Sequence, residues 1–88
     1  ARPPQREIPM NITMRDGRVF SGTALQIVKA MQDIAFGVEQ MTVDQYIDWV
    51  VQNAKRFEEV ELAISGETTE HRAKSLVAEM VAKGLARG

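Results

Sequence analysis

One short stretch near the start of the chain decides the fold, because an alternating apolar pattern leads there into a turn signal and then a helix cap. It reads Ile8-Pro9-Met10-Asn11-Ile12-Thr13-Met14-Arg15-Asp16-Gly17-Arg18-Val19-Phe20-Ser21-Gly22-Thr23. Large apolar side chains occupy every second position of residues 8–14, the period of a strand with one buried face. Asp-Gly is a strong turn signal, and a second short run follows it. The stretch therefore predicts a β-hairpin.

Two registers are open to this hairpin. A two-residue turn centred on Asp16-Gly17 would set Arg15 opposite Arg18, which is an unfavourable like-charge pair. A type I turn with a left-handed Gly17 would instead set Ile12 opposite Phe20. The second register keeps the large apolar side chains on one face, whereas a slip by one residue would exchange the faces. We therefore expect the second register.

Capping signals predict where the first two helices begin. In a capping box, two side chains three positions apart each bond the other residue's backbone amide. The chain holds two such pairs, Thr23 with Gln26 and Thr42 with Gln45. An apolar stripe at helical spacing follows each pair. Gly37 is a plausible stop for the first helix, and the stripe of the second helix continues to Phe57.

A second alternating run, residues 60–64, predicts a third strand with one wet face. Thr68 or Thr69 then caps a third helix, and Gly84 followed by Leu85 is typical of a Schellman end. The predicted order is therefore ββααβα. This order indicates an α+β fold, with one small three-stranded sheet and three helices packed on one face. We interpret residues 1–7 as a flexible N-terminal tail and residues 8–88 as a single compact domain.

Composition excludes several classes of chemistry. The 88 residues include no Cys, which excludes a disulfide scaffold, a cysteine-ligated metal site and thiol catalysis. The single histidine, His71, falls on the polar side of its helix, without a nucleophile or second ligand at a telling spacing. No apolar run approaches the length of a membrane span. We expect a cytoplasmic, non-enzymatic protein that needs no cofactor or metal and has no evident small-molecule substrate.

Apolar residues that lie off or at the edge of the helix stripes point to a protein partner, because exposed apolar groups mark interaction surfaces. These candidate contact residues are Leu25, Phe36, Val38, Trp49 and Val51. The partner can be another protein or a second copy of the chain. The simplest hypothesis is a two-fold homodimer.

A basic feature at the start of the chain supports an alternative hypothesis. Four arginines stand in the first 22 residues, namely Arg2, Arg6, Arg15 and Arg18. A basic arm together with a basic hairpin tip could contact phosphates in a nucleic acid. The whole chain has a net charge of −1, which does not favour a nucleic-acid binder. We therefore rank this alternative second.

Overall fold

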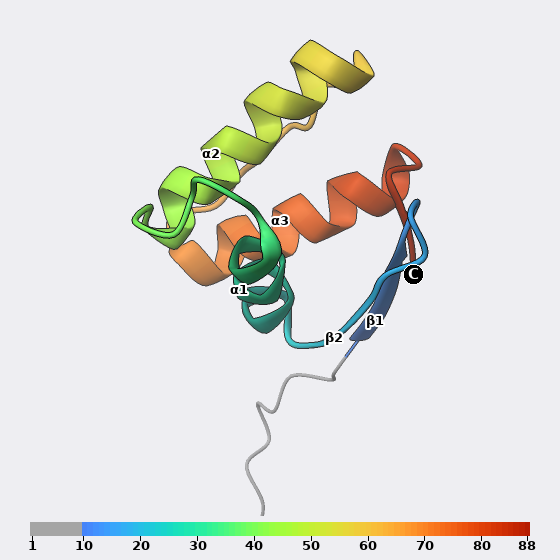
Figure 1. Cartoon of the computed structure of the whole chain (residues 1–88), viewed down its shortest axis with the longest axis horizontal. Helices are drawn as coiled ribbons and strands as arrows, with labels where there is room; N and C mark the ends of the chain where they lie inside the picture. Colours follow the sequence, from blue (N-terminus) through green and yellow to red (C-terminus); the bar gives the residue numbers. More distant parts are fainter. Residues whose placement is uncertain (1–9) are drawn as a thin grey trace, which may run out of the picture.

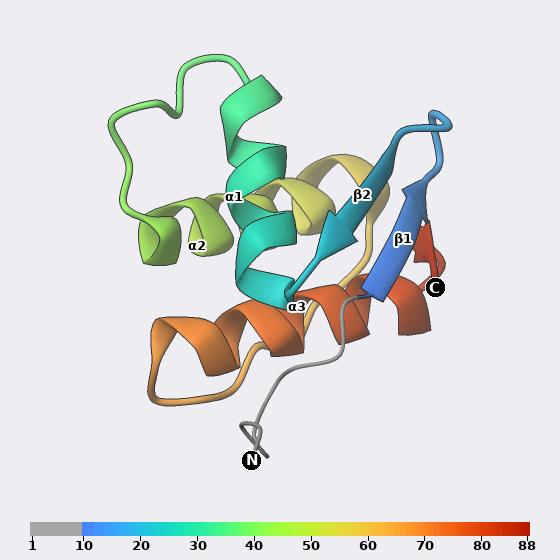
Figure 2. The ribbon, with the colours of Figure 1, turned by 90° about the horizontal axis from the view of Figure 1, so that it is seen from below.

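Three antiparallel strands form one layer of the protein and three helices form the other (Figures 1 and 2). The computed structural model describes residues 10–88, so the predicted tail and the predicted strand start at Ile8 lie outside the described residues. The elements are β1 (Met10–Met14), β2 (Val19–Gly22), α1 (Ala24–Ile34), α2 (Val43–Asn53), the π-helical turn η1 (Ala54–Glu58), α3 (Thr69–Ala82) and β3 (Ala86–Arg87). The strand order is β2-β1-β3. The α+β fold class is confirmed.

The hairpin adopts the expected register. Ile12 stands opposite Phe20, and the amide of Met14 donates to the carbonyl of Arg18 over 2.8 Å. Gly17 has φ +93°, a left-handed conformation that glycine adopts without steric cost. Ile12 is 2% exposed, whereas Val19 on the opposite face of the sheet is 60% exposed. The sheet therefore buries one face against the helices.

The N-terminal caps of the helices are also as predicted, whereas α1 ends at Ile34, before the predicted stop at Gly37. Both capping boxes are complete in the structure, at the starts of α1 and α2. Of the two candidates for the third cap, Thr68 accepts a hydrogen bond from the amide of His71 at 3.1 Å. His71 itself is exposed. Such caps each stabilise a helix by about 1 kcal/mol, because they satisfy amides that the helix leaves unpaired.

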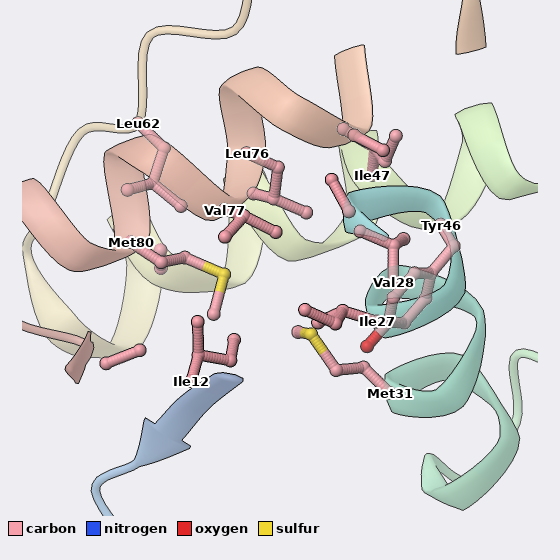
Figure 3. Packing of buried hydrophobic residues seen from close by; sticks show 14 of the residues in the cluster. Ile12, Ile27, Val28, Met31, Tyr46, Ile47, Leu62, Leu76, Val77 and Met80 are labelled. Carbon is pink, nitrogen blue, oxygen red and sulfur yellow. The ribbon is translucent and has the colours of Figure 1, made fainter. Parts of the chain in front are cut away.

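The core lies where α3 faces both β1 and α1 (Figure 3). Leu76 and Met80 of α3 are at most 1% exposed and belong to the same buried cluster as Ile12 of β1 and Ile27 of α1. Burying a side chain of this size contributes about 1.5–3 kcal/mol. These contacts hold the helical layer on the sheet.

The third strand is not where the alternation placed it, and this prediction is wrong. Residues 60–64 form no strand but run in an extended path beside α3. The amide of Ala63 donates to Glu79 of α3 at 2.9 Å, and the amide of Ser65 donates to the Ser75 hydroxyl at 3.1 Å. Leu62 is buried in the core. The alternation thus arises because one face of residues 60–64 packs on α3. Side chains of α3 accept the backbone hydrogen bonds that a neighbouring strand would otherwise accept.

Phe57 is 70% exposed, although the apolar stripe predicted an inward position. The cause is η1, because a π-helical turn holds more residues than an α-helical one and rotates the following side chains. The turn ends at Glu59, a left-handed residue with φ 57° whose amide donates to the carbonyl of Ala54. The same turn places Glu58 near the tip of the hairpin.

A Schellman motif ends α3, as predicted. The amide of Leu85 donates to the carbonyl of Met80 at 2.8 Å, and the amide of Gly84 donates to the carbonyl of Val81 at 3.2 Å. Gly84 has φ +83°. The reversal lays β3 beside β1, where Ala86 pairs with Met14 (Figure 1). The third strand therefore follows the third helix.

The two left-handed residues at the ends of η1 and α3 predict opposite effects on stability. Gly84→Ala meets no atom within 4 Å of the new methyl group, so its cost is the left-handed backbone alone. We expect it to lower the free energy of unfolding by about 1 kcal/mol. Glu59→Gly relieves the same kind of strain. We expect it to raise the free energy of unfolding by about 0.5 kcal/mol, because the entropy cost of glycine offsets part of the relieved strain.

Urea unfolding followed by circular dichroism measures both changes. Ala78→Gly, in the exposed middle of α3, is the control, because glycine there costs about 1 kcal/mol by helix propensity alone. If Glu59→Gly destabilised the protein as much as Ala78→Gly does, the assigned conformation of Glu59 would be wrong.

Candidate protein-interaction cleft

An apolar cleft opens between the tip of the β1–β2 hairpin and the helices. It has two adjoining hollows of about 370 and 250 Å³ that share Met14, Asp16, Met31 and Tyr46. The larger hollow is also lined by Arg15, Trp49, Val50, Asn53, Glu58, Met80 and Leu85. The smaller one extends to Arg18, Phe20, Ile34 and Ala35. We call the two together the hairpin cleft.

The lining of the hairpin cleft has the composition of a protein-binding surface. Methionine side chains reach it from β1, α1 and α3. Methionine is flexible and polarisable, which lets a surface adapt to a partner. The rings of Tyr46 and Trp49 stack with their centroids 5.7 Å apart and their planes inclined by 21°. Methionine and aromatic residues are the types enriched where proteins bind one another.

Tyr46 forms the inner part of this aromatic pair. It is 3% exposed, and Figure 3 shows its ring among Ile27, Val28 and Met31. Burial disfavours the charged phenolate and raises the pKa of Tyr46 to about 12. The phenol is therefore neutral at any physiological pH, and it presents a weakly polar group in an apolar wall.

Ion pairs cross the rim of the hairpin cleft. Arg15 contacts Glu58 at 2.7 Å and also donates to the carbonyl of Gly84 at 3.2 Å, which ties the hairpin tip to η1 and to the end of α3. Arg18 contacts Asp16 at 3.2 Å. All four charged side chains are well exposed, so each pair adds little to stability. Together they leave the rim with no excess charge.

The arginines of the nucleic-acid hypothesis fall into two groups. Arg15 and Arg18 belong to the hairpin tip and are each paired with a carboxylate, so the tip offers phosphates no uncompensated cation. Arg2 and Arg6 lie outside the described residues.

The candidate contact residues separate into three kinds. Trp49 is 36% exposed and lines the hairpin cleft, and Phe36 is 94% exposed two residues beyond Ile34 of the same cleft. Leu25 and Val51 are half-buried, pack against the core and line neither hollow. Val38 is 1% exposed, so its assignment as a surface contact is corrected: it is a core residue that anchors the loop between α1 and α2.

Most of the cleft lining was not singled out in the sequence. Met14, Met31, Met80 and Leu85 carry no local signal for a surface, because each belongs to a stripe or turn that is typical of a core or a connection. Their common feature appears only when segments far apart in the chain meet. The one usable signal was Trp49 at the edge of its helical stripe.

The described part of the chain holds no group of three acidic or histidine side chains placed to bind a metal ion. Among the helices of residues 10–88, none has the length and apolar character needed to span a bilayer. His71 lies at the start of α3 and does not line the hairpin cleft.

The single tyrosine allows a direct test of the burial of the cleft wall. The pKa of Tyr46 is raised from about 10 in the unfolded chain to about 12 in the folded protein. The neutral phenol therefore favours the folded state, and this contribution is fully present below pH 10 and is lost as the pH rises to 12. We expect about 2–3 kcal/mol of that stability to be lost as the pH rises from 10 to 12. Ultraviolet absorbance of the phenolate gives the titration midpoint, and the urea-unfolded chain is the control. A midpoint near 10 in a chain that circular dichroism shows to be folded would contradict a buried Tyr46.

No protein-family model, curated protein or solved structure matches this chain. The assignment of a function therefore depends on the residues themselves. Within the described residues, an apolar hollow of about 370 Å³, a stacked aromatic pair and the most exposed phenylalanine all lie on or beside one cleft.

Proposed function

We propose that the protein is a small, non-enzymatic interaction domain that self-associates as a homodimer through the hairpin cleft. One observation carries this proposal: three large apolar side chains remain exposed on or beside a single apolar cleft. They are Ile34 at 49%, Phe36 at 94% and Trp49 at 36%. Large apolar side chains that stay exposed around a cleft are unfavourable in water and are stabilised when a second protein covers them.

The charges around the hairpin cleft favour a second copy as that protein. The rim carries Arg15 and Arg18 together with Asp16 and Glu58, so it has both signs and no excess of either. A two-fold interface brings the same patch of each subunit together, and a patch with one sign of charge would repel itself. A balanced rim with an apolar centre is compatible with self-association.

The non-enzymatic role is supported by the chemistry of the lining. Tyr46 is held as a neutral phenol, and the charged groups of the rim are exposed and paired. General acid–base catalysis needs a group whose pKa lies near the working pH and that can reach a substrate. The hairpin cleft instead presents thioethers and aromatic rings, which recognise apolar side chains.

Light scattering after size exclusion, over a range of concentrations, tests the proposal. We expect a species of twice the chain mass that dissociates on dilution. Removal of an aromatic residue at an interface centre costs about 2 kcal/mol or more, so Trp49→Ala is expected to weaken the dimer roughly 30-fold or more. Dilution of the wild type should also shift the fluorescence of Trp49, the only tryptophan in the chain.

Phe57→Ser is the matched control, because Phe57 is an exposed aromatic residue that lines neither hollow. It should leave the dimer unchanged. A wild type that elutes at the monomer mass at every concentration would rule out self-association. Equal weakening by Trp49→Ala and Phe57→Ser would show that the hairpin cleft is not the interface.

A further inference from the structure

The loop between α1 and α2 holds a phenylalanine out in water. Phe36 is 94% exposed, the highest value among the exposed large apolar side chains of the described residues. Figure 2 shows that this loop arches away from the two layers. We propose that Phe36 of each copy inserts into the larger hollow of the other copy's hairpin cleft. This inference deepens the proposed function and rests on it.

The loop is built to hold Phe36 in one place. The side-chain amide of Gln32 donates to the carbonyls of Val38 and Met41, both at 2.9 Å, so it closes the loop on the end of α1. The amide of Ala35 donates to the Gln32 carbonyl at 3.2 Å, and the side chain of Val38 is buried in the core. A side chain displayed on a fixed loop loses little freedom when it binds, which is how preorganised anchors gain affinity.

The larger hollow fits a phenyl ring in size and in chemistry. An apolar cavity of about 150 Å³ is enough to take up benzene, and this hollow measures about 370 Å³. Met14 and Met31 can place their sulfur atoms against the edge of an inserted ring. The stacked rings of Tyr46 and Trp49 offer an aromatic surface beside it. The charged side chains that line this hollow, Arg15, Asp16 and Glu58, are well exposed and each forms an ion pair.

Phe36, which we call the knob, and the larger hollow lie close enough on one surface for each copy to insert its Phe36 into the other. Ile34 and Ala35, which directly precede Phe36, line the smaller hollow, and the smaller hollow adjoins the larger one. A two-fold rotation about an axis near Ile34 therefore carries each Phe36 toward the other cleft. The exposure of Phe36 shows that it does not occupy the cleft of its own chain.

Two variants separate the knob from the hollow. Phe36→Ser removes the knob at a position that makes almost no contact within its own chain. Asn53→Phe fills the larger hollow from its own wall, because Asn53 is a half-buried lining residue at the end of α2, and its helix propensity is similar to that of phenylalanine. Each variant alone should be monomeric at concentrations where the wild type is dimeric.

Mixing the two variants is the decisive measurement, with light scattering as the readout. A heterodimer of Phe36→Ser and Asn53→Phe keeps one intact knob and one open hollow that match. We expect it to form at least about tenfold more tightly than either variant alone, yet less tightly than the wild type. Trp49→Arg serves as a second blocked-hollow variant if thermal melting shows that Asn53→Phe has lost its fold.

The remaining outcomes distinguish this inference from the proposed function. A dimer that persists in Phe36→Ser overturns the insertion of Phe36 but leaves self-association standing. Loss of the dimer in Phe36→Ser without recovery on mixing overturns it as well, because Phe36 would then contact a different surface. A monomeric wild type overturns both. Phe57→Ser is the matched control for Phe36→Ser: it removes an exposed phenylalanine that lines neither hollow, so this variant must stay dimeric on its own.

Discussion

The buried face of α3 is the constraint on which the rest of the structure depends. Leu76 and Met80 on that face are at most 1% exposed, and the helix contacts α1, α2 and β3. Arg72 on the same helix reaches Asp44 of α2 at 3.0 Å, so a polar contact supports the apolar one. A small domain has little core to spare. With α3 removed, the apolar face of the hairpin would be covered by α1 alone, and α2 would keep α1 as its only helix neighbour apart from η1, which continues it.

This arrangement also explains why a cleft exists. The hairpin and α2 both attach to α3, and Met80 and Leu85 at its end line the gap that remains between them. The ion pair of Arg15 with Glu58 spans that gap at its rim. The lining is apolar because its residues are extensions of the core stripes. A binding surface of this kind arises from packing geometry and needs no dedicated motif.

Features that depend on a few neighbouring residues were predictable, and features that depend on distant ones were not. The capping boxes, the left-handed Gly17 and the Schellman end are set by hydrogen bonds within one turn, so their sequence signals sufficed. Residues 60–64 show the limit of such signals. Alternation of apolar and polar residues indicates which side chains are buried, but it does not indicate which groups the backbone bonds to. The two-residue β3 has no pattern at all. The hairpin cleft is lined by four separate segments of the chain. Among their apolar residues, only Trp49 gave a local indication of an exposed surface.

The pairing of β1 with β3 has a consequence for how the chain acquires its fold during synthesis. Thr13 pairs with Arg87, and Arg15 bonds the carbonyl of Gly84, so one edge of the central strand is completed by residues about seventy positions later. The hairpin turn and the capping boxes of α1 and α2 are local features that can form early on the ribosome, whereas this edge must wait. Until residues 84–87 emerge, this edge of the central strand presents unpaired backbone groups, which are the groups through which strand edges pair with other extended segments.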